Sequence, residues 1–311
     1  MSEFDVVVVG GGAAGLSAAL VLTRARRRVL VVDAGTPRNA PAAHMHGFLS
    51  RDGLPPLDLL TIRREEVGAY GGRIANDTVT RILNGSKSGF RVELRVGGSI
   101  AARRLLVASG LRDELPDIPG LRERWARDVL HCPYCHGYEV KDKVLGVLGW
   151  FPQAVGYAQI VRQWSDDVVY LAPTGTLTPA AREQLAARAI VVVEGSVQRV
   201  RVVADQLDGV ELDDDRTVHI DALFVPPRFV PNNELLVELG CACDDDGWPT
   251  TQSDGCTSVA GVWVAGNVAN PRAQVITAAG EGSATAIAIN ADLVEEDIRD
   301  ALARAASPTS A

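Results

Sequence analysis

The stretch that decides the fold is Phe4-Asp5-Val6-Val7-Val8-Val9-Gly10-Gly11-Gly12-Ala13-Ala14-Gly15. Its first half is apolar and β-branched, which is typical of a strand buried on both faces. The Leu- and Ala-rich segment 16–25 then predicts a helix, and segment 28–32 predicts a second strand that ends at Asp33. Together these segments form a βαβ unit, so we expect an α/β fold.

The glycines Gly10, Gly12 and Gly15 match the pattern G-x-G-x-x-G. In this pattern the first glycine forms a tight turn, the second lets the backbone approach a pyrophosphate, and the third lets the helix pack closely on the strand. The N–H groups at the helix N-terminus also attract phosphates, and the carboxylate of Asp33 can accept hydrogen bonds from ribose hydroxyls. We therefore predict a dinucleotide site rather than an ordinary glycine-rich turn, although the motif does not separate FAD from NAD.

Composition excludes several classes of protein. A chain of 311 residues suggests two domains, and its 47% hydrophobic and 23% charged residues can build a sizeable core. A net charge of −8 argues against a nucleic-acid binder. The start of the chain lacks the basic region of a signal peptide, and glycines interrupt the apolar run 6–22. We expect a cytoplasmic protein with no membrane span.

A cysteine pair stands out in the middle of the chain, within His131-Cys132-Pro133-Tyr134-Cys135-His136. Cys132 and Cys135 can form a disulfide across one turn, and a nearby helix N-terminus would favour a thiolate. His136 could move protons at neutral pH. Half of a zinc site or an inert pair are the alternatives, but zinc needs a second half with suitable spacing. The other cysteines do not offer one, so we predict no metal site and expect them to be small buried or partly exposed residues: Cys241, Cys243 and Cys256.

A second βαβ unit follows the cysteine pair. Segment 144–148 predicts a strand, Gly149–Pro152 a turn, 154–164 a helix and 168–171 a strand. The turn-rich segment 115–120 is a candidate domain boundary. Elsewhere we expect strands at 90–96, 105–108, 190–193, 222–225 and 262–265, and a helix at 280–293.

These motifs, taken together, resemble a low-molecular-weight thioredoxin reductase over nearly the whole chain. The resemblance includes the first glycine turn, Ala108-Ser109-Gly110, the central C-x-x-C pair, and the segments 261–268 and 274–280. It implies two Rossmann-like nucleotide-binding domains and a homodimer. The FAD-binding domain would be discontinuous, with residues 1–114 and 245–311, and a central domain of residues 115–244 would carry the cysteine pair.

The same resemblance implies the FAD site. Asn267 stands where the family usually has Asp, and its amide can still bind a ribityl hydroxyl. The residues that the resemblance places against FAD are Gly10, Gly12, Ala13, Ala14, Gly15, Asp33, Arg38, His44, Val79, Ala108, Asn267, Gln274 and Val275.

The second glycine turn departs from the family pattern. Where the family has a glycine-rich loop for NADPH, this chain has Gly149-Trp150-Phe151-Pro152-Gln153-Ala154. The Phe151 side chain would occupy the approach of the pyrophosphate, and Pro152 lacks an N–H donor. No Lys or Arg lies between Arg162 and Arg182 to bind a 2′-phosphate. We expect that the NADPH site is lost; the alternative is NADPH bound in an unusual geometry.

The residue after the second cysteine also differs from the family pattern. Thioredoxin reductases typically have Asp at this position, whereas this chain has His136. This feature is similar to the flavin-dependent dithiol oxidases of the gliotoxin and holomycin type. The resemblance implies that a small-molecule dithiol attacks Cys132, that Cys135 passes electrons to FAD, and that O₂ reoxidises the flavin to give H₂O₂. His136 is the predicted base, with Glu139 and His131 as weaker candidates. The alternatives are a thioredoxin-disulfide reductase fed by NADPH or ferredoxin, and a non-enzymatic FAD-bearing redox sensor.

Overall fold

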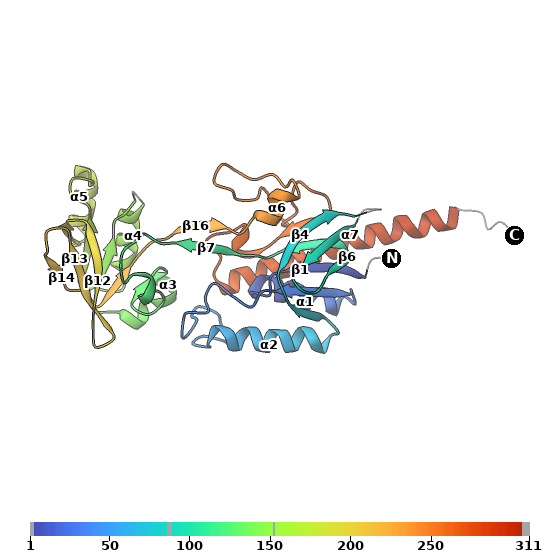
Figure 1. Cartoon of the computed structure of the whole chain (residues 1–311), viewed down its shortest axis with the longest axis horizontal. Coiled ribbons are helices and arrows are strands. Elements are labelled where there is room, and N and C mark those ends of the chain that lie inside the picture. The colour runs from blue at the N-terminus through green and yellow to red at the C-terminus, as the bar shows by residue number, and fades with distance from the viewer. Residues whose placement is uncertain (1–2, 86–88, 152, 307–311) are drawn as a thin grey trace. The chain divides into compact units, whose positions relative to one another are not determined.

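A computed structural model describes residues 3–85, 89–151 and 153–306 (Figure 1). The chain divides into two compact units. The first unit comprises Met1–Ala40, Phe48–Arg112 and Phe229–Ala311, and the second comprises Pro41–Gly47 and Asp113–Arg228. The second unit is thus inserted into the sequence of the first.

The first unit is built on a mostly parallel sheet. Its strand order is β3-β2-β1-β6-β5-β4, and β17 also pairs with β6. Strands β1, β2, β3, β6 and β17 pair in parallel, whereas β4 and β5 join in antiparallel fashion. The elements of this unit are β1 (Phe4–Val9), α1 (Ala13–Arg24), β2 (Val29–Asp33), α2 (Pro56–Ala69), β3 (Arg73–Asn76), β4 (Val79–Asn84), β5 (Phe90–Leu94), β6 (Ser99–Val107), α6 (Glu234–Glu238), β17 (Val262–Val264), η3 (Gly266–Val268) and α7 (Val275–Ala306).

Alternate side chains of β1 enter two separate apolar cores. Val6 and Val8 pack with residues of α1 and α7, and Val7 and Val9 pack with residues of β4, β5 and α6. The period of two follows from the pleat of a strand. Both faces are buried, so the strand is apolar throughout except for Asp5, whose carboxylate pairs with Arg28 at 3.0 Å.

Helix α7 is fixed to the first unit by close packing and by ion pairs. A Cβ on Gly282 would lie 2.1 Å from the carbonyl oxygen of Ala14, so only glycine lets α7 approach α1 this closely. Further along the helix, Arg103 pairs with Glu296 at 3.2 Å, and Arg104 pairs with Asp292. These contacts place the start of α7 beside the first glycine turn.

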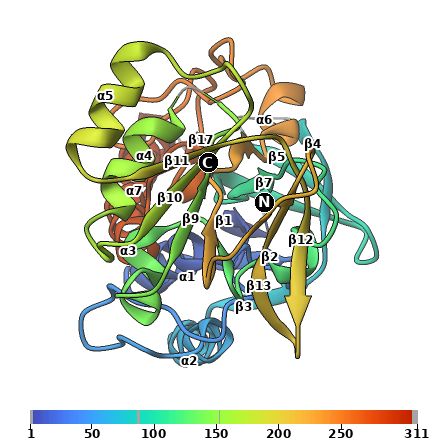
Figure 2. The ribbon, with the colours of Figure 1, turned by 90° about the vertical axis from the view of Figure 1, so that its left-hand side faces the viewer.

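The second unit also has a parallel sheet, with the order β11-β10-β9-β15-β8. Helices α4 and α5 lie on one face of this sheet, and β12 and β13 lie on the other (Figure 2). The elements are β8 (Val129–Leu130), α3 (Pro133–His136), η2 (Tyr138–Val140), β9 (Leu145–Leu148), α4 (Ala154–Val161), β10 (Val168–Ala172), α5 (Pro179–Ala187), β11 (Val191–Glu194), β12 (Val197–Val203), β13 (Gln206–Leu212), β14 (Thr217–Val218) and β15 (Ala222–Phe224), with η1 (Arg122–Arg124) before β8.

Apart from the short segment 41–47, the chain passes between the units through β7 (Leu111–Glu114) and β16 (Arg228–Pro231). These two strands pair with each other in a two-stranded sheet. The first crossing lies close to the predicted boundary at 114/115. The second crossing lies at 228/229 rather than 244/245, because α6 packs Leu236 into the core of the first unit.

The α/β class and the two βαβ units are confirmed. Strand β1 has the predicted bounds, but α7 is much longer than the predicted helix 280–293. Helix α2 and the sheet β12-β13-β14 were not predicted. Within the part of the chain that the structure describes, no helix has both the length and the apolar character needed to cross a membrane.

Candidate active site

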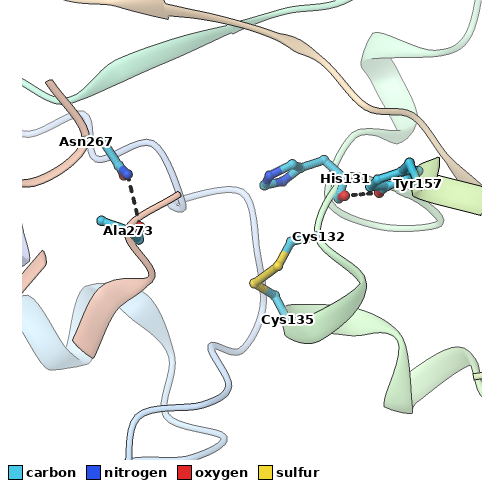
Figure 3. Close-up of a disulfide and its surroundings, with 6 residues drawn as sticks. All are labelled: His131, Cys132, Cys135, Tyr157, Asn267 and Ala273. Carbon is cyan, nitrogen blue, oxygen red and sulfur yellow. Dashed lines mark hydrogen bonds between the residues drawn. A yellow bond between two sulfur atoms is a disulfide. The ribbon is translucent and has the colours of Figure 1, made fainter. Parts of the chain in front are cut away.

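Cys132 and Cys135 are joined by a disulfide, with their Cα atoms 5.2 Å apart (Figure 3). Cys132 follows the end of β8 and is the N-cap of α3. The N–H of Cys135 donates to the carbonyl of Cys132 at 3.1 Å, which closes the single turn of the motif. Pro133 at the first helical position is pre-organised for this turn because its φ angle is fixed.

Helix α3 contains only Pro133–His136. A single helical turn has few aligned peptide groups, so its dipole gives little stabilisation to a thiolate at Cys132. Cys132 does lie at a helix N-terminus, but the electrostatic effect of so short a helix is small. A nearby base therefore matters more for generating thiolates at this site.

The turn that holds the disulfide packs on the indole of Trp164. Gly137 follows α3, and a Cβ there would lie 2.8 Å from the indole of Trp164, so the chain packs directly on that ring. Tyr134 contacts the same indole edge-on, with ring centroids 5.4 Å apart. Tyr134 and Tyr138 keep 63% and 67% of their surface exposed. Two exposed aromatic rings thus lie close in sequence to the redox disulfide.

His131 is held by its backbone and by its ring. Its carbonyl accepts a hydrogen bond from the hydroxyl of Tyr157 (Figure 3), and burial raises the pKa of that hydroxyl. The His131 imidazole stacks on Trp125 with centroids 6.1 Å apart. These contacts fix the chain just before Cys132.

His136 is the last residue of α3, and burial lowers the pKa of its imidazole. Glu139 opposes this shift, and His46 adds to it. The carboxylate of Glu139 lies 3.4 Å from Nε2 of His46. A lowered pKa keeps His136 neutral near pH 7, which is the form that can accept a proton from a thiol. Sequence reasoning found His136 and Glu139 but missed His46, because that residue lies far away in the chain.

The first glycine turn has the geometry that its motif predicts. Gly10 has a φ of +105°, and a Cβ there would lie 2.4 Å from the carbonyl oxygen of Ala108. A Cβ on Gly15 would lie 1.9 Å from the carbonyl oxygen of Gly10, so helix and strand are in close contact. At Gly12, by contrast, no described atom lies within 4 Å of the position that a Cβ would take. The backbone of Gly12 therefore faces open space, as the motif requires for the approach of a pyrophosphate.

Asp33 lies at the end of β2, where the motif places a ribose-binding carboxylate. It accepts from the N–H of Gly35 at 3.2 Å and pairs with the guanidinium of Arg64. The Nε atom of Arg64 is buried and has no hydrogen-bond partner among the described residues. Next to it, Arg63 donates to the carbonyl of Ala13 at 3.3 Å, and burial lowers the pKa of Arg63. Both arginines come from α2, which the sequence did not reveal.

Asn267 lies on η3, close to the start of α7. Its amide donates to the carbonyl of Asn270 at 2.9 Å and to that of Ala273 at 3.0 Å, the second of which is drawn in Figure 3. The carbonyl of Gln274 accepts from the N–H of Ala278, and Val275 is the first residue of α7. The carboxylate of Glu281 accepts from the N–H of Gly266 at 3.0 Å. The oxygen of the Asn267 amide takes no part in these bonds, so it can still accept one from a ligand hydroxyl.

Ala13 and Ala14 begin α1 directly after the first glycine turn. The surroundings of three further predicted FAD residues differ from one another. The guanidinium of Arg38 lies 5.0 Å from the ring centroid of Phe229. The Val79 side chain is buried in the core, which leaves only its backbone for a ligand. His44 is exposed and belongs to segment 41–47 of the second unit, whereas the other predicted FAD residues belong to the first. These three assignments stay predictions, as do the other residues expected to contact FAD.

The turn of the second βαβ unit is filled by side chains. Nε1 of Trp150 donates to the carbonyl of Pro226 at 2.8 Å, and Trp150 contacts Phe151 with ring centroids 4.9 Å apart. A Cβ on Gly149 would lie 2.5 Å from the ring of Tyr170. Pro152, the other residue predicted to disfavour NADPH, lies outside the described residues.

The basic residues nearest to the end of β10 in sequence are engaged with carboxylates. Arg162 pairs with Asp166, and Arg182 pairs with Glu194. Neither guanidinium is therefore a ready partner for a 2′-phosphate. In the described ranges, no group of three or more His, Cys, Asp or Glu side chains could hold a metal ion. Burial raises the pKa of the three thiols outside the motif, those of Cys241, Cys243 and Cys256.

Comparison with known proteins places these features in context. Residues 4–282 match the family described as pyridine nucleotide-disulphide oxidoreductase. Thioredoxin reductase sirT of Leptosphaeria maculans is 30% identical over 319 residues, which cover 96% of each chain. Thioredoxin reductase aclD of Aspergillus oryzae is 34% identical over 253 residues, which cover 76% of this chain and 80% of the relative. The crystal structure of HlmI superposes with a TM-score of 0.94 and 54% identity, covering 97% of this chain and 96% of that chain.

Proposed function

The chain belongs to the pyridine nucleotide-disulphide oxidoreductases, among their thioredoxin reductase-like members, and we propose that it is an FAD-dependent dithiol oxidase. Its substrate would be a small-molecule dithiol of the natural-product type, which it would convert into a disulfide. The acceptor of the electrons would be O₂, with H₂O₂ as the second product.

The observation that carries this proposal is the blocked turn of the second βαβ unit. Trp150 and Phe151 fill the place where a dinucleotide-binding turn needs small residues, and Trp150 is held there by its bond to Pro226. A disulfide enzyme without a hydride donor needs another source of electrons, and a reduced dithiol can supply them by thiol–disulfide exchange.

The residues of the first unit fit FAD. The open space at Gly12, the carboxylate of Asp33 and the orphaned Nε of Arg64 suit a pyrophosphate and a ribose, and Asn267 retains an acceptor oxygen. When bound, FAD would supply two-electron chemistry between the cysteine pair and O₂.

The cysteine pair and His136 would carry out the exchange. A substrate thiol gives its proton to His136, and the thiolate attacks Cys132, so that the bond to Cys135 breaks and Cys135 leaves with the electron pair. The second substrate thiolate then attacks the first substrate sulfur and releases Cys132. The substrate loses two electrons, and the enzyme disulfide gains them.

A thioredoxin-disulfide reductase is the second candidate, and the names of the curated relatives favour it, since sirT and aclD are both called thioredoxin reductases. Such an enzyme would take electrons from NADPH in an unusual geometry, or from ferredoxin, and reduce a protein disulfide. It differs from the first candidate in the direction of electron flow.

An anaerobic experiment separates the two candidates. The FAD-loaded protein is mixed separately with NADPH, with reduced ferredoxin and with dithiothreitol, and the flavin absorbance is followed. We expect bleaching by the dithiol and not by NADPH or ferredoxin, followed by one H₂O₂ per flavin when air is admitted. Fast bleaching by NADPH or ferredoxin would support the reductase instead.

We also propose that the protein is a cytoplasmic homodimer. The apolar side chains Ile287, Val294, Ile298 and Leu302 are exposed along α7 at helical spacing. A second copy could cover this stripe. Sedimentation of the wild-type protein and of an Ile298→Glu variant would test this, with a dimer expected only for the wild type.

A further inference from the structure

Two imidazoles share one carboxylate next to the redox disulfide. His136 ends α3, and Glu139 lies three residues later in η2. Gly137, between them, keeps helical backbone angles, with φ −66° and ψ −31°. Residues three apart on helical backbone lie on the same side, so the Glu139 carboxylate lies beside His136.

His46 reaches this carboxylate from a distant part of the sequence. Segment 41–47 precedes α2 in the chain, yet it belongs to the second unit. In that segment Met45 is buried, which anchors the loop, and His46 is half-buried with Nε2 3.4 Å from Oε1 of Glu139. The side chain of Glu139 is 44% exposed, so it can still exchange protons with solvent.

We propose that Glu139 and His46 are positioning residues that take protons from His136, so that one base can deprotonate both thiols of a substrate in succession. This inference rests on the dithiol oxidase activity proposed above. It gives a role to Glu139, which the sequence offered only as a weaker candidate for the base, and to His46, which the sequence did not single out.

The requirement for a second proton acceptor follows from the balance of the reaction. The first thiol gives its proton to His136, its sulfur bonds to Cys132, and Cys135 leaves as a thiolate. His136 passes that proton to the His46–Glu139 pair and becomes neutral again. The second thiol then gives its proton to His136, the substrate disulfide forms, and Cys132 leaves as a thiolate. The two protons held by the imidazoles equal the two that the cysteine thiolates need to become thiols.

Two ionisable groups act on His136. Glu139 of η2 and His46 of the loop both act on His136, and the disulfide does not titrate. Lys141, which follows η2, lies over the ring of Tyr138 at 3.9 Å. The His46–Glu139 pair is therefore the main ionisable partner of His136.

The test measures how fast dithiothreitol opens the Cys132–Cys135 disulfide in the full-length, FAD-loaded enzyme. Samples are quenched anaerobically with an alkylating reagent, and the free thiols are counted by mass spectrometry between pH 6 and pH 9.5. We expect His46→Gln and Glu139→Gln each to slow opening about tenfold at pH 7. The double variant should be no slower than either single one, because both remove the same relay.

The pH profile separates a relay from a structural role. At pH 9.5 much of the dithiol is already ionised, so both variants should approach the wild-type rate. His219→Gln is the matched control, since His219 faces Asp208 at 3.7 Å in the same unit but away from the cysteine motif in sequence. Its rates should equal those of the wild type at every pH.

The outcomes distinguish this inference from the proposed function. If the wild-type disulfide opens and the variants match it at pH 7, or lose the same factor at every pH, the relay is wrong and the oxidase proposal stands. If dithiothreitol does not open the wild-type disulfide at all, the proposed function itself fails. FAD content and circular dichroism identify a variant that has not folded, in which case the other single variant decides.

Discussion

The first turns of the two βαβ units use the same backbone hydrogen bond. They differ in what lies at the second position of the glycine motif. Gly10 donates its N–H to Val32 at 2.8 Å, and Gly149 donates its N–H to Leu171 at 2.7 Å, so each glycine links its strand to the next one. Two residues later, Gly12 faces open space in the first unit, whereas Phe151 packs on Trp150 in the second. The fold needs the first glycine of the motif, but only a bound dinucleotide needs the second.

This difference also explains how one unit could lose a ligand without losing its structure. The apolar cores on both faces of the β9–β10 sheet do not depend on a phosphate group. Aromatic side chains at the turn add buried contacts in place of the ligand. The second unit can therefore keep its sheet and its cysteine motif while electrons enter at sulfur.

The largest effect is expected when the cysteine pair can no longer accept electrons from a dithiol. In Cys135→Ser no disulfide can form, so dithiothreitol should no longer bleach the flavin, a loss of more than about 10³-fold. The FAD content should not change, because the first unit is untouched. The matched control is Cys243→Ser, which replaces a half-buried free thiol. Flavin bleaching that survives in Cys135→Ser would show that electrons enter elsewhere.

The next largest effect concerns the close contact in the first turn. In Gly15→Ala the new Cβ would lie 1.9 Å from the carbonyl oxygen of Gly10, so the helix and strand must separate. We expect the free energy of unfolding to fall by about 3 kcal/mol or more. Urea denaturation of the FAD-free protein measures this directly, and an unchanged midpoint would contradict the packing role.

The Gly12→Ala variant is the counterpart of Gly15→Ala in the same turn. It should weaken FAD binding and leave folding nearly unchanged. No described atom lies within 4 Å of the new Cβ, so the unfolding free energy of the FAD-free protein should change by less than about 0.5 kcal/mol. The Cβ would instead occupy space needed by the pyrophosphate and raise the dissociation constant of FAD about tenfold. Fluorescence titration with FAD provides the measurement. Equal affinity in the two proteins would mean that the cofactor does not approach this glycine.

The smallest effect is on the pH dependence of stability in the second unit. Burial lowers the pKa of His136 in the folded state below its unfolded value of about 6.5. The unfolded chain therefore binds a proton first as the pH falls, and stability is lost between about pH 7 and the lower folded pKa. His136→Asn cannot titrate, so its stability relative to the wild type should improve as the pH falls from 8 to 5. A constant difference across this range would show that His136 is not buried as a neutral group.

Much of this structure follows from local sequence patterns. The valine run of β1 and the glycines after it predicted a strand and a turn because both depend on neighbouring residues alone. The spacing of Cys132 and Cys135 likewise predicted a disulfide that the structure contains. Contacts between distant segments were beyond such reasoning. Arg64 meets Asp33 only because α2 packs on α1 and β3, and α2 has a weakly patterned sequence that gave no signal.

The boundaries of the units were hard to predict for the same reason. Leu236 lies in a helix of five residues, which is too short to show a periodic pattern in the sequence. Its membership of the first unit is seen only from its packing in the core. Strands β12 and β13 carry many charged residues, because one of their faces meets solvent, so they lack the apolar runs of the buried parallel strands.

The pairing of β7 with β16 has a consequence for protein engineering. Because the chain leaves and re-enters at neighbouring points, residues 113–228 form a cassette whose two ends already meet. Exchanging residues 113–228 for the equivalent part of a relative would need one junction in each of these paired strands. The chimaera would also have to import residues 41–47, since that short loop travels with the cassette in space although it is encoded far upstream.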